Sequence, residues 1–131
     1  METNEKRRLR ILVVDDSRAM RAYLRSSLKG FDAEVSECGS GSEGLRMLAR
    51  LGSVDLCILD WNLPEMDGLA MLVEIRKSPA HDAMRIVMVT TEVEADRVRQ
   101  ALEAGAQEYL MKPFTPEALL EKLSLIGLAK P

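Results

Sequence analysis

Apolar runs alternate along the chain with stretches whose apolar residues recur every three or four positions, and this alternation predicts strands and helices in turn. Strands are predicted over residues 9–14, 33–38, 55–60, 85–91 and 107–111. Helices are predicted from Ser17 to Gly30, from Ser40 to Gly52, from Leu69 to just before Pro79, over 93–104, and from Thr115 onward. A strand and a helix therefore alternate through the whole chain, with short connections.

Capping residues support three of the predicted helix starts. Ser17 precedes the first helix, Ser40 forms a capping box with Glu43, and Thr115 stands before a proline that suits the first helical position. The glycines predicted to end helices are Gly30, Gly52 and Gly105.

The order of these elements predicts the fold class. Strands that alternate with helices form βαβ units, and their right-handed crossovers make the strands parallel. Residues 55–60 are mostly apolar rather than alternating, which is typical of a strand that helices cover on both faces. The sequence therefore predicts one α/β domain with a mostly parallel sheet, without internal repeats or linkers.

Composition excludes several classes of protein. The 131 residues are 47% hydrophobic and 30% charged, as in an ordinary soluble domain. No apolar run could cross a bilayer and the start lacks a signal peptide, so we expect a cytoplasmic protein without membrane contacts. Residues 1–8 are predicted to be a flexible basic lead-in, not a nucleic-acid site, because the net charge is −3 and no aromatic residues accompany the basic run.

Cysteine and histidine offer little chemistry. Cys38 and Cys57 lie on separate predicted strands without metal-ligand spacing, so we expect reduced packing residues. His81 is the only histidine and falls in a predicted loop beside a proline, which leaves nothing from which to build a zinc site or a histidine-based triad.

The strand ends share a chemical theme. Asp15 and Asp16 follow the first strand, Asp60 ends the third, Thr90 lies at the end of the fourth, and Lys112 follows the fifth. Because the carboxyl ends of parallel strands meet at one edge, these side chains should converge there. Carboxylates packed together favour a divalent cation such as Mg²⁺, while lysine and hydroxyl groups suit phosphoryl oxygens. Each acid could instead merely cap a helix or turn, although that reading explains the combination less well.

Residues 9–128 resemble the receiver domain of bacterial two-component response regulators, most closely its stand-alone, CheY-like members. The motifs that carry the resemblance are Val13-Val14-Asp15-Asp16-Ser17, Asp60-Trp61-Asn62-Leu63-Pro64, Met66-Asp67-Gly68, Val89-Thr90, Glu108-Tyr109 and Lys112-Pro113-Phe114. The resemblance implies a flavodoxin-like (βα)5 fold with a five-stranded parallel sheet of order 2-1-3-4-5, helices on both faces, and no output domain.

The same resemblance implies a metal site and an acceptor. Asp60 would be the phosphoacceptor. Asp16 and Asp60 would bind Mg²⁺ directly, the main-chain carbonyl of Asn62 would be a third ligand, and Asp15 would act mainly through water.

Further roles follow from the resemblance. Lys112 would bind the phosphoryl group, Thr90 would be the switch hydroxyl and Tyr109 the aromatic that changes rotamer, and the Lys112–Pro113 peptide would be cis. The side chains that tune dephosphorylation would be Asn62 and Glu92, and because both are polar we predict a short-lived phosphorylated state.

The predicted function is that of a monomeric, single-domain response regulator. A histidine kinase would phosphorylate it, and the face formed by residues 93–104, residues 107–111 and the last helix would then change to control a protein target, in chemotaxis or motility. It would catalyse only its own phosphorylation and dephosphorylation.

Three alternatives remain open. A phosphorelay intermediate or phosphate sink would share every site residue. A Mg²⁺-dependent aspartyl phosphatase of the haloacid dehalogenase type needs an acid two residues after its nucleophile, where Asn62 stands. An FMN carrier is disfavoured because the loop after the first strand is acidic where a phosphate cradle needs donors.

Overall fold

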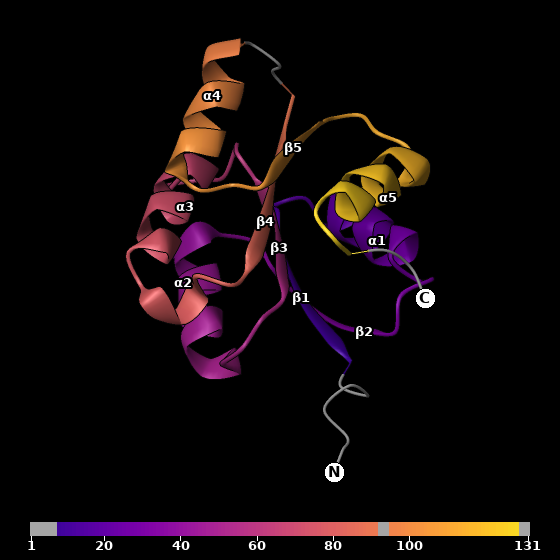
Figure 1. Ribbon diagram of the computed structural model, residues 1–131, viewed down its shortest axis with the longest axis horizontal. Coiled ribbons are helices and arrows are strands. Elements are labelled where there is room, and N and C mark those ends of the chain that lie inside the picture. Colours follow the sequence, from indigo (N-terminus) through magenta and orange to yellow (C-terminus); the bar gives the residue numbers. More distant parts are fainter. Residues whose placement is uncertain (1–7, 92–94, 129–131) are drawn as a thin grey trace.

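In a computed structural model, which describes residues 8–91 and 95–128, a five-stranded parallel sheet lies between two layers of helices (Figure 1). The strands are β1 (Leu9–Val14), β2 (Ala33–Cys38), β3 (Leu56–Asp60), β4 (Arg85–Thr90) and β5 (Glu108–Met111). The helices are α1 (Arg18–Ser27), α2 (Gly41–Leu51), α3 (Gly68–Arg76), the short 3-10 helix η2 (Pro79–His81), α4 (Ala95–Ala104) and α5 (Pro116–Leu125).

The strand order is β2-β1-β3-β4-β5, and every pair of neighbouring strands is parallel. Helices α1 and α5 cover one face of the sheet, and α2, α3 and α4 cover the other (Figure 1). The predicted flavodoxin-like fold is therefore confirmed. None of the helices in the described part of the chain is long and apolar enough to span a membrane.

In the described residues, the core consists of one apolar cluster on each face of the sheet. Successive side chains of a strand point to opposite faces, so β1 sends Leu12 and Val14 to the α2–α3–α4 side and Ile11 and Val13 to the α1–α5 side. This explains why the central strands are apolar throughout instead of alternating. Both cysteines are free and buried, and Cys57 lies in the α2–α3–α4 cluster. Burial raises the pKa of the Cys38 thiol to about 11, which suits a packing residue better than a reactive one.

The predicted helix caps form as expected. The side-chain oxygens of Ser17, Ser40 and Thr115 each accept a hydrogen bond from the amide three residues later, at 3.1–3.2 Å. The carboxylate of Glu43 accepts from the amide of Gly39 at 3.3 Å, one residue before the partner expected in a capping box.

Some predicted boundaries were wrong. Helix α1 ends at Ser27, not at Gly30, because the chain turns at Leu28 and places Phe31 in the core with 7% of its surface exposed. Strand β3 begins at Leu56, β4 ends at Thr90, and β5 begins at Glu108, each one residue inside the prediction. The predicted start of the fourth helix at Val93 lies outside the described residues.

The loop between β3 and α3 passes very close to the end of β3. The amide of Gly68 donates a hydrogen bond to the carbonyl oxygen of Trp61 at 2.8 Å. A Cβ atom on Gly68 would lie 2.3 Å from the carbonyl oxygen of Asp60, so only glycine fits at this position. This contact fixes the path of the loop that follows Asp60.

Replacing Gly68 with alanine should therefore force this loop away from β3. We expect Gly68→Ala to lower the free energy of unfolding by about 1–3 kcal/mol, as measured by urea denaturation. Gly39→Ala is the matched control, because its Cβ would meet its nearest neighbour, Arg21, at 3.5 Å and should change stability by less than about 0.5 kcal/mol. Equal losses in the two variants would contradict this explanation.

Candidate functional site

Three carboxylates meet at the carboxyl edge of the sheet. Asp15 and Asp16 follow β1, and Asp60 is the last residue of the neighbouring strand β3. One carboxylate oxygen from each lies within 4.8 Å of the others, which makes this the only such group of potential metal ligands found among residues 8–91 and 95–128. Asp15 and Asp60 are each 2% exposed, whereas Asp16 faces solvent. The predicted convergence of these side chains is therefore present in the structure.

Lys112 joins the two buried carboxylates. Its Nζ atom lies 3.0 Å from Oδ2 of Asp15 and 3.4 Å from Oδ1 of Asp60. The amide of Lys112 donates to the carbonyl oxygen of Thr90 at 2.8 Å, which ties this residue to the end of β4. The peptide between Lys112 and Pro113 is cis, as predicted.

The charges in this cluster do not balance. Burial, and then the negative charge of Asp15, raise the pKa of Asp60 above its ordinary value of 3.8, although Lys112 and the amide of Asn62 act in the opposite direction. Burial alone would lower the pKa of Lys112, but its contacts with Asp15 and Asp60 outweigh burial and raise that pKa, so the ammonium group stays protonated. At their formal charges, three carboxylates and one ammonium give the cluster a net charge of −2.

Backbone groups orient the two buried acids. The amide of Ser17 donates to Oδ1 of Asp15 at 2.8 Å, and the amide of Asn62 donates to Oδ1 of Asp60 at 3.3 Å. Arg21 donates from Nη1 to the carbonyl oxygen of Asp15 at 2.7 Å. Sequence reasoning did not single out Arg21, whose only signal is its position one helical turn after the capping Ser17.

The predicted switch residues lie on neighbouring strands. Thr90 ends β4 and is 2% exposed, and Tyr109 is half-buried on the edge strand β5. The register pairs Tyr109 with Met88 and Thr90 with Met111, so the two residues are offset along the strands. Asn62 is exposed in the loop after β3, whereas Glu92 lies outside the described residues.

Two cations that sequence reasoning missed lie over aromatic rings. The guanidinium of Arg97 in α4 lies 4.7 Å from the ring centroid of Trp61, the residue after Asp60. Nζ of Lys122 in α5 lies 4.5 Å from the ring centroid of Tyr109. Both contacts join segments that are far apart in the sequence, so helical spacing alone could not indicate them.

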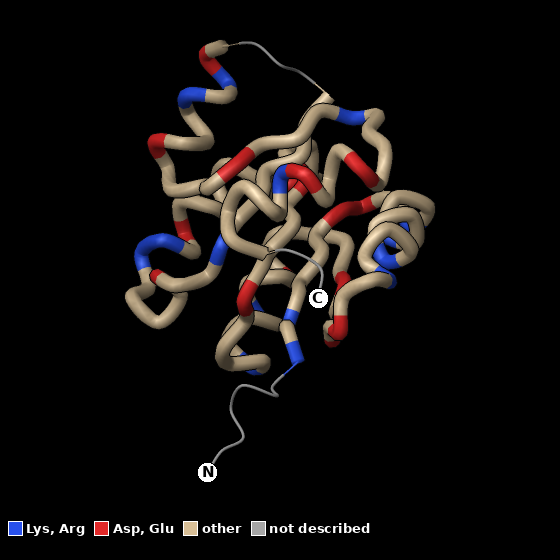
Figure 2. The backbone as a smooth tube through the Cα atoms, turned by 45° about the vertical axis from the view of Figure 1, so that its right-hand side comes forward, with Lys and Arg blue, Asp and Glu red and all other residues tan. Residues whose placement is uncertain are grey.

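Elsewhere, acidic and basic positions are interspersed along the backbone (Figure 2), a pattern that differs from a continuous basic groove for nucleic acid.

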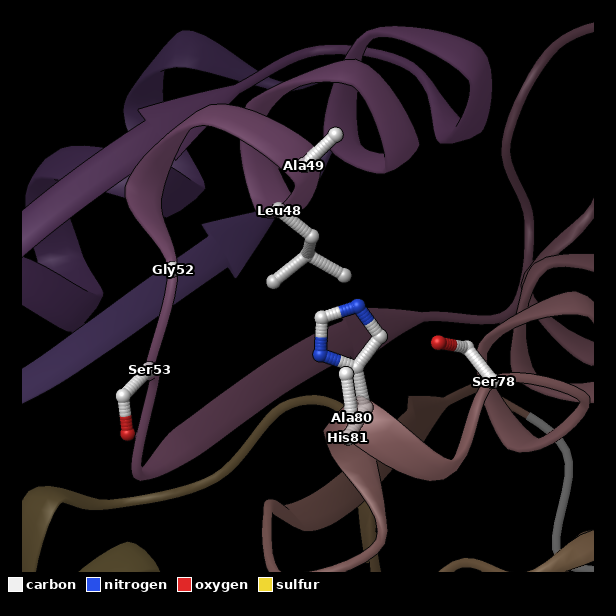
Figure 3. Close-up of a pocket in the computed structure, with 7 residues that line it drawn as sticks. All are labelled: Leu48, Ala49, Gly52, Ser53, Ser78, Ala80 and His81. Atoms are coloured by element: carbon white, nitrogen blue, oxygen red, sulfur yellow. The ribbon is translucent and has the colours of Figure 1, made fainter.

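His81 lies away from this cluster. It lines a hollow of about 450 Å³ between α2 and η2, where its ring lies below Leu48 in the view of Figure 3 and the hydroxyl group of Ser78 points toward it. These residues precede β3 and β4, so the hollow is at the end of the sheet opposite to Asp60. Within the described parts of the chain, no group of three or more potential metal ligands includes His81.

Comparisons with a family model, with known sequences and with solved structures all match this chain to the same kind of protein. Residues 11–124 match the family model described as the response regulator receiver domain. The chain is 42% identical over 117 residues to a chemotaxis protein CheY homolog of Campylobacter jejuni, and the alignment covers 88% of this chain and 89% of that protein. It is 38% identical over 119 residues to chemotaxis protein CheY1 of Helicobacter pylori, covering 90% and 96% of the two chains. The solved structure of the chemotaxis response regulator CheY4 of Vibrio cholerae superposes with a TM-score of 0.84 at 31% identity, covering 92% of this chain and 99% of that one.

Removing one of the two repelling buried charges should stabilise the protein. We expect Asp60→Asn to raise the free energy of unfolding at neutral pH in metal-free buffer by about 0.5–2 kcal/mol. Because folding raises the pKa of Asp60, ionisation of this carboxyl group destabilises the folded wild type as pH rises. The gain in stability of Asp60→Asn over wild type should therefore disappear as pH falls to 3.8, the ordinary pKa of the group. Urea denaturation across this pH range is the measurement.

Asp67→Asn provides the control for this substitution. Asp67 lies in the same loop and caps α3 by accepting from the amide of Ala70 at 2.8 Å, and asparagine caps equally well. A loss of stability in Asp60→Asn, or a gain of the same size in Asp67→Asn, would contradict the electrostatic account.

Proposed function

The chain belongs to the response regulator receiver domain family, and we propose that it is a single-domain response regulator that accepts a phosphoryl group from a histidine kinase on Asp60. CheY-like receivers are phosphorylated by histidine kinases and act on protein targets. The stand-alone arrangement is supported by the near-complete alignment with the C. jejuni relative, which covers 88% and 89% of the two chains. The observation that carries the proposal is the Lys112 ammonium shared by Asp15 and Asp60.

The cluster suits Mg²⁺ as a cofactor. Its side-chain ligands are carboxylate oxygens, the type that Mg²⁺ prefers, and the formal charge of the three acids exceeds that of Lys112 by two. We propose that Asp16, Asp60 and the main-chain carbonyl of Asn62 hold the ion, with Asp15 acting through water. When bound, the ion would neutralise charge on the phosphoryl oxygens during transfer.

The chain's own residues would carry the transfer. One carboxylate oxygen of Asp60 forms a bond to phosphorus while the bond from phosphorus to the kinase's histidine nitrogen breaks and leaves its electron pair on that nitrogen. Lys112, now 3.4 Å from Oδ1 of Asp60, would then pair with the new phosphoryl oxygens. The product is an acyl phosphate, and water later releases phosphate and restores Asp60.

We propose that the signal is read from the face formed by α4, β5 and α5. Thr90 would move toward the phosphoryl group, and Tyr109 would change rotamer into the space that Thr90 leaves. Ala101 is the one buried residue among the described positions of α4, and Ala104 packs against the core beside it. The named relatives are chemotaxis proteins, which supports a target in chemotaxis or motility.

The setting proposed for this activity is the cytoplasm. The free thiols of Cys38 and Cys57 suit a reducing compartment. The protein would act as a monomer and would catalyse only its own phosphorylation and dephosphorylation. A phosphatase that turns over phosphomonoesters has weaker support, because Asn62 stands where such an enzyme needs its second acid.

Loss of the acceptor should abolish phosphorylation. With Mg²⁺ present, we expect Asp60→Asn to show no phosphorylated product from a histidine kinase or from acetyl phosphate, and Lys112→Met to react about 10²–10³-fold more slowly because it lacks the charge that stabilises the transferring group. Phosphate-affinity electrophoresis separates the two forms. Asp67→Asn is the matched control and should react like wild type, whereas wild-type phosphorylation of Asp60→Asn would place the acceptor elsewhere.

The phosphorylated form should be short-lived. Asn62 is polar and exposed beside Asp60, where it can hydrogen-bond the attacking water, and Glu92 is also polar. We expect Asn62→Met to lengthen the half-life several-fold, measured as loss of phosphoprotein after removal of the donor. A wild-type half-life of many hours would contradict this prediction.

A phosphorelay intermediate or phosphate sink would share the same site. Rapid return of the phosphoryl group to a second histidine-containing protein, without a target that prefers the phosphorylated form, would favour that alternative. Capture of a motility protein by the phosphorylated form but not by Asp60→Asn would favour the proposed function.

A further inference from the structure

A charged group on α5 lies directly over the aromatic ring of β5. Nζ of Lys122 is 4.5 Å from the ring centroid of Tyr109 and 3.1 Å from Oε1 of Glu108. The side chains of Lys122 and Glu108 are 26% and 19% exposed, so water screens this group only partly. The ammonium thus contacts a carboxylate and a ring from two successive residues of one strand.

Glu108 also fixes the backbone at this point. The oxygen that pairs with Lys122 accepts a hydrogen bond from the amide of Tyr109 at 3.0 Å. Because β5 is the edge strand, this bond satisfies a backbone donor without a neighbouring strand. The carboxylate therefore holds the ammonium close to the residue whose ring the ammonium covers.

We propose that Lys122, held by Glu108, is a positioning residue that keeps the ring of Tyr109 in its observed place and so opposes the active arrangement until Asp60 is phosphorylated. This inference rests on the proposed switch role of Tyr109. A cation over a partly exposed ring changes an equilibrium by about two- to fivefold, enough to set a resting population without preventing activation.

An ordinary surface ion pair would behave differently. Lys77, the residue after α3, pairs with Glu74 at 2.8 Å on the exposed surface, so Lys77→Met removes an ion pair in which no aromatic ring takes part. If Lys122 only covers the ring of Tyr109, the ring stays in place in Lys122→Met and becomes more exposed to water. If Lys122 holds the ring outward, as proposed, the ring moves inward in Lys122→Met and becomes less exposed. The sign of the change in exposure therefore distinguishes simple cover from positioning.

The chain has two tyrosines, Tyr23 and Tyr109, which makes fluorine NMR of 3-fluorotyrosine protein a simple readout. Tyr23→Phe assigns the two resonances. Exposure of the Tyr109 fluorine to a water-soluble relaxation agent is then measured in wild type, Lys122→Met, Lys122→Arg and Lys77→Met, all without phosphorylation. Affinity for beryllofluoride, a phosphoryl analogue, is measured in parallel with Mg²⁺ present.

We expect reduced exposure of Tyr109 in Lys122→Met and, by linkage, two- to fivefold tighter beryllofluoride binding. Lys122→Arg keeps the cation and should resemble wild type, as should Lys77→Met. Unchanged or increased exposure in Lys122→Met, or an equal change in Lys122→Arg, would overturn the proposal. The fluorine measurement needs no phosphoryl transfer, so failure of Asp60 to become phosphorylated would count against the proposed function alone.

Discussion

The structure depends on one electrostatic arrangement, in which the ammonium of Lys112 lies between the buried carboxylates of Asp15 and Asp60. Two such carboxylates repel each other strongly when little water separates them, and their repulsion would push the ends of β1 and β3 apart. Lys112, which follows the edge strand β5, offsets part of this repulsion with its positive charge. The remaining negative charge suits a divalent cation, which supports the proposed transfer of a phosphoryl group to Asp60.

A packed sheet, a closely approached loop and helix α4 surround this site. The sheet is packed on both faces, and the close approach of Gly68 to the carbonyl oxygen of Asp60 fixes the loop beside it. Helix α4 buries Ala101 and has two arginine contacts around it: Arg76 donates to the carbonyl oxygen of Gly105 at 3.1 Å, just after the helix, and Arg97 lies over the ring of Trp61. Trp61 belongs to the core, adjoins Asp60 and contacts Arg97, so the proposed signal would have a route to α4 through the core.

Most of the fold could be predicted from the sequence, because strand and helix periodicities were clear and consecutive βαβ units leave few topologies. The convergence of Asp15, Asp60 and Lys112 followed from the shared edge of a parallel sheet. Contacts such as that of Lys122 with Tyr109 could not be predicted, because they depend on how α5 is rotated against β5. The predicted stop at Gly30 failed for a similar reason: burial of Phe31 determines where the chain turns.

The most direct test of the account is chemical trapping of the phosphorylated residue. Borohydride reduces an aspartyl phosphate to homoserine, and peptide mass spectrometry locates the altered position. After reaction with a phosphodonor and Mg²⁺, the account predicts homoserine at position 60 and at no other aspartate. Homoserine at position 15 or 16, or unmodified peptide from protein that carries phosphate, would contradict it.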